Sequence, residues 1–73
     1  MNENKLVTMA NQIAAFFDSM PDRSEAVSGL ANHIRATWDP RMRQGLKHHI
    51  DTCGDAELHP IVKEALPRIL AAE

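Results

Sequence analysis

A single cysteine, Cys53, occurs in the 73 residues, so the chain forms no disulfide within itself. Small secreted domains usually depend on several disulfides, so one lone thiol fits a reducing compartment. The N-terminal residues 1–5 also lack the charged stretch and following apolar run of a secretory signal. We therefore expect a cytoplasmic location.

Long apolar runs and an excess of positive charge are missing as well. No stretch approaches the roughly 18 consecutive apolar residues that a bilayer span requires. Lys and Arg total 8 against 10 Asp and Glu, which gives a formal net charge of −2. Binding to a phosphate backbone needs clustered positive charge. Neither a membrane nor a nucleic acid is therefore an expected partner.

The residues that carry catalytic or metal chemistry are few and scattered. The three glycines are far apart, so there is no glycine-rich phosphate loop. A nucleophilic Cys53 would need an adjacent base and a substrate pocket, which four short helices offer poorly. His49 and Cys53 are four residues apart and could form half of a zinc site, but His33, His48 and His59 show no finger or ribbon spacing. We expect no catalytic, cofactor-binding or metal-binding residue in this chain.

The sequence does contain enough apolar residues, 44%, to form a folded core. They recur with a helical period, and no segment alternates as a half-buried strand would. The helical segments cover about residues 4–19, 23–37, 40–52 and 60 onward. The pattern predicts one all-α domain over residues 1–73, a small compact bundle of about four short helices.

Local signals mark where these helices begin and end. Asp22 with a Glu three residues later forms a capping box, and Asp39 followed by Pro40 is a second start signal. Gly54 suits the position just after a helix. Pro67 lies inside the last helical pattern and predicts a kink or fraying near residues 64–66.

The apolar stripes predict which side of each helix faces the core. Gly29, inside the second segment, predicts that another helix packs closely there. The first helix is expected to bury a stripe with Phe16 at its margin: Leu6, Met9, Ala10, Ile13, Phe17 and Met20. The third is expected to have the apolar edge Met42, Leu46, His49, Ile50 and Cys53.

The segment from Trp38 to Arg43 combines the only tryptophan, an Asp-Pro helix start and two arginines. Arg35 and Lys47 extend its positive flank. Trp and Arg are enriched among the residues that dominate binding energy at protein interfaces. An alternative is that Trp38 fills the core and the arginines form a solvated face. The segment is expected to set the corner between two helices, with its arginines on the outer side as candidate contacts.

Three strings carry a resemblance to a known family: MANQIAAFF at 9–17, ANHI at 31–34 and WDPRMR at 38–43. They resemble the small delta subunit of NAD-dependent, molybdenum- or tungsten-containing formate dehydrogenases, over about residues 6–66. The resemblance implies an accessory subunit that binds the catalytic subunit and supports formation or stability of active enzyme. It also implies that the partner complex holds bis-molybdopterin guanine dinucleotide, iron–sulfur clusters, FMN and NAD, while this chain holds no cofactor.

On this interpretation one surface of the chain contacts the catalytic subunit. The expected contacts are Trp38, Arg41 and Arg43, with Asn32, His33 and Asp39 shaping the same surface. Two alternatives are a transient maturation chaperone for cofactor insertion and a self-associating helical module, which would be a homo-oligomer when isolated. A metal-binding regulator ranks last.

Overall fold

The computed structural model describes residues 3–71, and within this range it contains helices and no strand. The helices are α1 (Glu3–Phe17), α2 (Arg23–Thr37), α3 (Pro40–Cys53) and α4 (Pro60–Ile69). The prediction of an all-α chain with four short helices is confirmed. The first predicted helix is two residues too long at its end, because α1 stops at Phe17.

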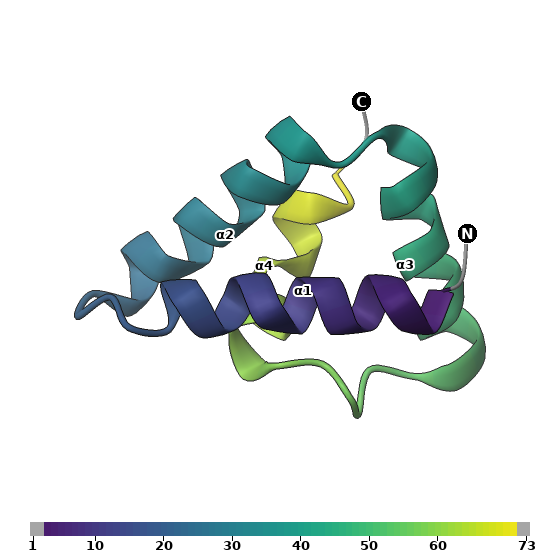
Figure 1. Ribbon diagram of the computed structural model, residues 1–73, viewed down its shortest axis with the longest axis horizontal. Coiled ribbons are helices and arrows are strands. Elements are labelled where there is room, and N and C mark those ends of the chain that lie inside the picture. Colours follow the sequence, from purple (N-terminus) through teal and green to yellow (C-terminus); the bar gives the residue numbers. More distant parts are fainter. Residues whose placement is uncertain (1–2, 72–73) are drawn as a thin grey trace.

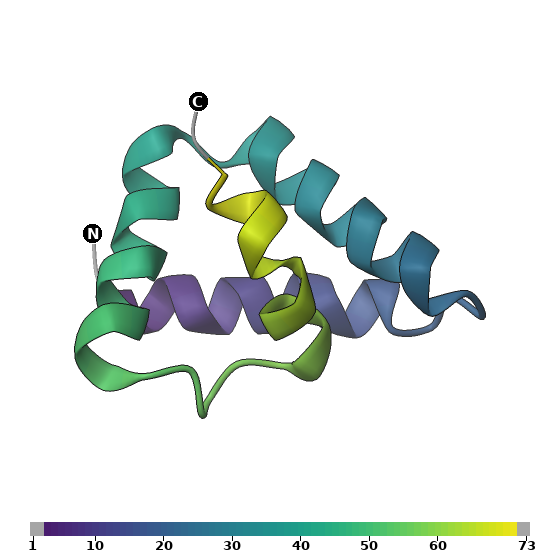
Figure 2. The ribbon, with the colours of Figure 1, turned by 180° about the vertical axis from the view of Figure 1, so that it is seen from behind.

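Three helices, α1, α2 and α3, form a triangular frame, and α4 covers one side of it. In Figure 1, α2 and α3 rise from opposite ends of α1 and meet at a corner. Figure 2, the reverse view, shows α4 lying across the inside of this frame. α4 packs mainly on α2 and also touches α1, while α3 packs on α1. The result is a flat molecule of 32 × 26 × 17 Å.

The predicted caps fix the starts of two helices. Asp22 lies before α2, and its carboxylate accepts a hydrogen bond of 3.1 Å from the Glu25 N–H. Asp39 does the same for α3, accepting 3.0 Å from the Met42 N–H, with Pro40 as the first helical residue. These bonds satisfy backbone donors that a helix N-terminus otherwise leaves without partners. Helix starts were therefore predictable from local sequence.

The segment between α3 and α4 is held by its two ends and by α1. Gly54 follows α3 with a φ of 85°, a left-handed conformation that glycine adopts readily. The Asn11 side chain donates to the Glu57 carbonyl at 2.9 Å and accepts from the His59 N–H at 2.8 Å. Asn11 therefore ties this loop to the middle of α1. The sequence pattern did not indicate this role of Asn11.

The last helix does not fray where predicted. α4 continues through Pro67 to Ile69, and the Leu70 N–H still donates to the Leu66 carbonyl at 2.8 Å. Pro67 lacks an N–H, so the carbonyl of Lys63 loses its helical donor. Both residues are exposed, so water can replace that bond. The prediction of fraying near residues 64–66 is wrong for this reason, while the alternative of a kink there stays a prediction.

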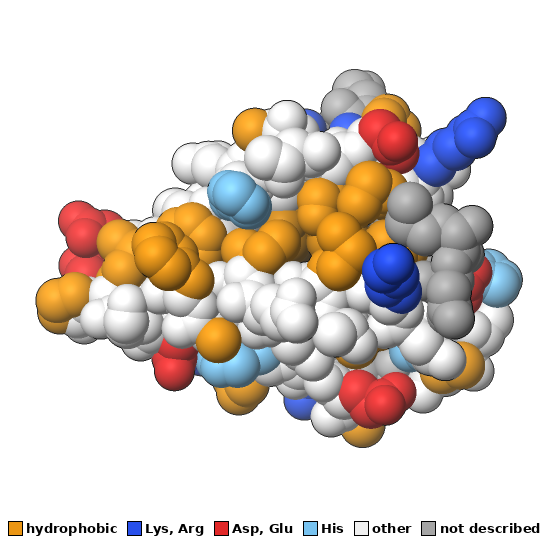
Figure 3. Space-filling view, viewed as in Figure 1, with side chains coloured by type: hydrophobic (Ala, Val, Ile, Leu, Met, Phe, Trp, Pro, Cys, Tyr) orange, Lys and Arg blue, Asp and Glu red, His pale blue; other side chains and the backbone are white. Residues whose placement is uncertain are grey.

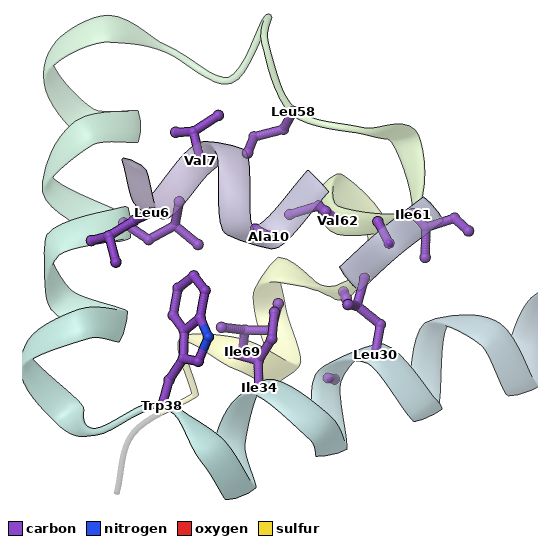
Figure 4. Close-up of a cluster of buried hydrophobic side chains, with 14 of the residues drawn as sticks. Leu6, Val7, Ala10, Leu30, Ile34, Trp38, Leu58, Ile61, Val62 and Ile69 are labelled. Carbon is purple, nitrogen blue, oxygen red and sulfur yellow. The ribbon is translucent and has the colours of Figure 1, made fainter. Parts of the chain in front are cut away.

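One hydrophobic cluster joins all four helices (Figure 4). Its buried members are Leu6, Val7, Ala10, Ala14, Ala26, Leu30, Ala31, Ile34, Trp38, Leu46, Leu58, Ile61, Val62, Ala65 and Ile69. Small residues supply much of the α1 contribution, which lets the other helices lie close to its backbone. No helix within residues 3–71 is long and apolar enough to cross a bilayer.

The buried side of α1 is rotated from the predicted stripe. Val7 and Ala14 are buried although neither was in the stripe, while Met9, Ile13, Phe17 and Met20 are only partly buried. Leu6 and Ala10 were assigned correctly. Because apolar residues occupy about half of the α1 circumference, their period alone could not choose which part faces the core.

Two glycines mark places where α1 side chains press against another helix. A Cβ at Gly29 would lie 2.7 Å from Cε1 of Phe17, so α2 makes room there for the phenyl ring. The close approach predicted at Gly29 is confirmed. A Cβ at Gly45 would lie 2.8 Å from Cδ1 of Leu6, so α3 has a matching position that sequence analysis did not single out.

We expect Trp38→Ala to lower the free energy of unfolding by about 3–5 kcal/mol, because it empties the largest site in the core. That amount is comparable to the whole stability of a domain this small, so the variant should be largely unfolded. Phe16→Ala should change stability by less than about 0.5 kcal/mol, since Phe16 is 71% exposed. Urea titration followed by far-UV circular dichroism measures both. Equal losses for the two variants would contradict this description of the core.

Candidate functional site

The predicted site, residues 38–43, forms the corner between α2 and α3. Trp38 follows α2 directly, and its N–H donates to the Ile34 carbonyl at 2.8 Å. Its backbone is already extended, and Asp39 then caps α3. The chain therefore turns from one helix into the next within two residues. The Asp-Pro signal placed this corner correctly.

Trp38 is a core residue, with only 5% of its surface exposed. Figure 4 shows its indole ring extending from the corner toward Leu6, with Ile34 and Ile69 beside it. The alternative in which Trp38 fills the core therefore describes its position. In this structure Trp38 supports the corner and offers a partner almost no surface.

The two arginines of the segment face different ways. Arg41 is exposed at the start of α3, whereas Arg43 is buried, with 8% of its surface exposed. Residues two apart lie about 200° apart around an α-helix, so both could not face outward. The interpretation of Arg43 as an outward-facing arginine is wrong. Its side chain instead lines a hollow of about 210 Å³ next to Gln44, Lys47 and the end of α4.

The rest of the expected positive flank is engaged within the chain. Arg35 lies at the end of α2, and its Nη1 donates to the carbonyl of Arg68 at 3.0 Å. The carbonyls of Ile69 and Ala71 lie 3.5 Å from the same nitrogen. Arg35 therefore caps the C-terminus of α4, where a cation is favoured by the helix dipole. Lys47 pairs with Asp51 at 2.9 Å, one turn along α3.

Asn32 and His33 are both exposed on α2. The His33 ring lies against Phe17 of α1, with ring centroids 6.1 Å apart. Asn32 lies about 100° around the helix from His33. Of the two, only His33 makes a ring contact with a side chain of α1.

Asp39 and Arg41 open onto a second hollow, of about 340 Å³, between α1 and α3. Its other lining residues are Glu3, Leu6, Met42 and Gly45. The Asp39 carboxylate is used as the α3 cap, and Glu3 is 2.7 Å from Nδ1 of His48. Within residues 3–71, Arg41 makes no ion pair. The guanidinium is therefore the group at this hollow that is available to a partner.

The histidines are dispersed rather than gathered around a metal. His49 is buried at 5% exposure and lies 3.8 Å from Glu57, while His59 lies 3.9 Å from Asp18. Nδ1 of His59 also accepts from the Ile61 N–H and caps α4. Cys53 was expected on the apolar edge of α3 but is exposed. Across the described part of the chain, no three His, Cys, Asp or Glu side chains come together as metal ligands would.

An apolar surface on α1 itself was not among the predicted contacts. Figure 3 shows a row of hydrophobic side chains that begins between α1 and α2 and continues along α1 toward α3. We call the partly or largely exposed apolar residues of α1 and of the turn after it the α1 band, and define it as Met9, Ile13, Phe16, Phe17 and Met20. Phe16 is 71% exposed and packs edge-on against Phe17, with ring centroids 5.3 Å apart. The signal was present in the sequence, because the α1 stripe was broader than a core in so small a domain can cover.

A family model described as the NADH-dependent formate dehydrogenase delta subunit, FdsD, matches residues 5–66. The chain belongs to the formate dehydrogenase delta-subunit family. The match covers α1 from Lys5 onward, all of α2 and α3, and α4 as far as Leu66, and it includes the corner and the α1 band. The resemblance inferred from the three strings is thus confirmed. No curated protein and no solved structure matches the chain.

Within this delta-subunit corner, we expect Asp39→Ala to lower the free energy of unfolding by about 1 kcal/mol, through loss of the α3 cap. Arg41→Ala should leave stability within about 0.5 kcal/mol of the parent, because the side chain is exposed. Urea titration of the two variants beside the parent measures the difference. A larger loss for Arg41→Ala than for Asp39→Ala would contradict these assignments.

Proposed function

We propose that this delta subunit is a non-catalytic accessory subunit that binds the molybdopterin-binding catalytic subunit of formate dehydrogenase. Its role is to support formation or stability of active enzyme. The observation that carries the proposal is the family match over residues 5–66, nearly the whole chain. The proposal places bis-molybdopterin guanine dinucleotide, iron–sulfur clusters, FMN and NAD in the partner complex.

The chemistry of the side chains supports an accessory role. Iron–sulfur clusters are held by sets of cysteines, and this chain has only Cys53. His48, His49 and His59 each lie beside a different carboxylate, that of Glu3, Glu57 and Asp18 respectively. Within residues 3–71, no three His, Cys, Asp or Glu side chains come together where a metal could be held. A single thiol also fits a cytoplasmic location, which is part of the proposal.

The predicted contacts divide into two roles under this proposal. Arg41, His33, Asn32 and Asp39 are exposed and can reach a partner subunit. Trp38 and Arg43 are buried and act by holding the corner that presents Arg41. A substitution that disturbs Trp38 would therefore impair binding through folding, and only an exposed residue can test contact directly.

Co-purification tests the proposal. The chain is expressed with the other formate dehydrogenase subunits, an affinity tag is placed on the catalytic subunit, and active enzyme is purified. We expect the delta subunit to remain at one copy per catalytic subunit. A strain without the delta subunit should yield less active enzyme or enzyme that loses activity faster.

The stoichiometry also separates this function from a transient maturation role. A chaperone for cofactor insertion would be found with immature catalytic subunit and be absent from active enzyme. The proposal would be contradicted altogether if the delta subunit were found with neither immature nor active enzyme, and if a strain without it gave enzyme of normal yield and stability.

A further inference from the structure

The α1 helix carries more apolar surface than the core of this chain uses. The core takes Leu6, Val7, Ala10 and Ala14, which lie on one side of the helix. Met9, Ile13 and Phe16 recur every three to four residues on the adjoining side, and Met20 continues them into the turn after α1. Phe16 is largely exposed, and the other members are partly buried against the core, which leaves their outer sides uncovered in a row along the helix. A row of this kind is more than the isolated exposed apolar residue that is ordinary on a protein surface.

The composition of the α1 band suits a protein partner. Phe and Met are enriched at protein interfaces, because they bury a large apolar area. Methionine also adapts its shape to a neighbour, since its side chain is unbranched and flexible. Phe16 is the exposed part of the band and packs edge-on against Phe17, which is itself partly buried against α2 and His33. The band therefore has aromatic rings at its centre and a flexible methionine, Met9 or Met20, at each end.

Positive charge lies at the end of the band where α1 begins (Figure 3). Lys5 is one turn before Met9, and Arg41 lies beside the hollow that Leu6 and Met42 line. Neither cation makes an ion pair with any residue from 3 to 71. The nearby Glu3 is paired with His48, and Asp39 caps α3, so local carboxylates are already engaged.

A second copy of this chain is a poor match for that end of the band. In an antiparallel pair of α1 helices, Lys5 would face the α1–α2 turn of the other copy. The acidic groups there are Asp18, which lies 3.9 Å from Nε2 of His59, Asp22, whose carboxylate caps α2, and Glu25. Arg23 lies between Asp22 and Glu25, and the N-terminus of α2 adds a partial positive charge. Of the three carboxylates, only that of Glu25 makes no hydrogen bond or ion pair within residues 3–71, so the turn presents a single free carboxylate to Lys5.

We propose that the α1 band, with Lys5 and Arg41 at its end, is the surface by which this chain binds the formate dehydrogenase complex. The complementary surface is an apolar ridge or groove of another subunit, with a carboxylate placed opposite Lys5 and Arg41. This inference rests on the proposed accessory function and specifies the face and the chemistry of its partner. On this inference the main contact with the partner is made by α1, whereas the sequence predicted it at the corner formed by residues 38–43.

Competition between variants and the parent chain tests the face. The tagged catalytic subunit is expressed with equal amounts of the parent chain and one variant, and the ratio of the two in purified enzyme is measured by mass spectrometry. Phe16→Asp should be depleted at least about tenfold relative to the parent, because it places a charge at the centre of the band. Ala15→Asp is the matched control, since Ala15 is exposed in the same turn and lies about 100° around the helix from Phe16, on the side away from Phe17. It should be incorporated as well as the parent.

The charged end is tested in the same way. Lys5→Glu should be depleted about threefold, and the depletion should shrink when the complex is assembled at high salt. Lys63→Glu, an exposed lysine on α4, is the control and should compete equally at both salt concentrations. Circular dichroism of each isolated variant verifies that it is folded. Should Phe16→Asp be unfolded, Phe16→Ser replaces it.

The outcomes separate this inference from the function on which it depends. Equal incorporation of Phe16→Asp and Ala15→Asp would overturn the α1 band as the binding face, while retention of the parent chain would leave the accessory function standing. Loss of the parent chain from purified enzyme would instead contradict the function. A third outcome is that the isolated chain forms a homodimer which Phe16→Asp disrupts, while the Phe16→Asp variant is still incorporated normally into the enzyme. That outcome would assign the band to self-association and overturn the inference.

Discussion

Burial of Trp38 is the contact on which the arrangement of the helices depends. Its ring is the largest side chain in the core and lies beside residues of α1, α2 and α4. The backbone around it leaves α2 and enters α3 within two residues, so the ring and the corner are formed together. A chain of 73 residues has few other large apolar groups with which to fix the angle between helices.

Helix boundaries were predictable from the sequence because their causes are local. Asp22, Asp39 and Gly54 act within a few residues of their own positions, and each does what its position predicted. The buried side of α1 was not predictable in the same way. Val7 and Ala14 are buried because α1 packs against α2, α3 and α4, and the side of α1 that these helices cover depends on residues far along the chain.

In the candidate site, too, local sequence did not predict which residues are buried. The family resemblance and the corner followed from the 38–43 string, but the string did not separate residues that build the corner from residues that face outward. Arg43 was misassigned although its two-residue spacing from Arg41 already opposed a shared face. Phe16 was treated as marginal, because its exposure became apparent only once the other helices had taken the opposite side of α1.

The Asn11 side chain bears on how the length of this chain can change during evolution. Its amide group makes hydrogen bonds to the backbone of Glu57 and of His59, which are two residues apart. These two bonds fix the position of the loop between α3 and α4 relative to α1. An insertion or deletion near these residues would break at least one of the bonds and shift the start of α4. Relatives that keep an asparagine at this position should keep the same loop length, whereas those that have lost it are free to vary.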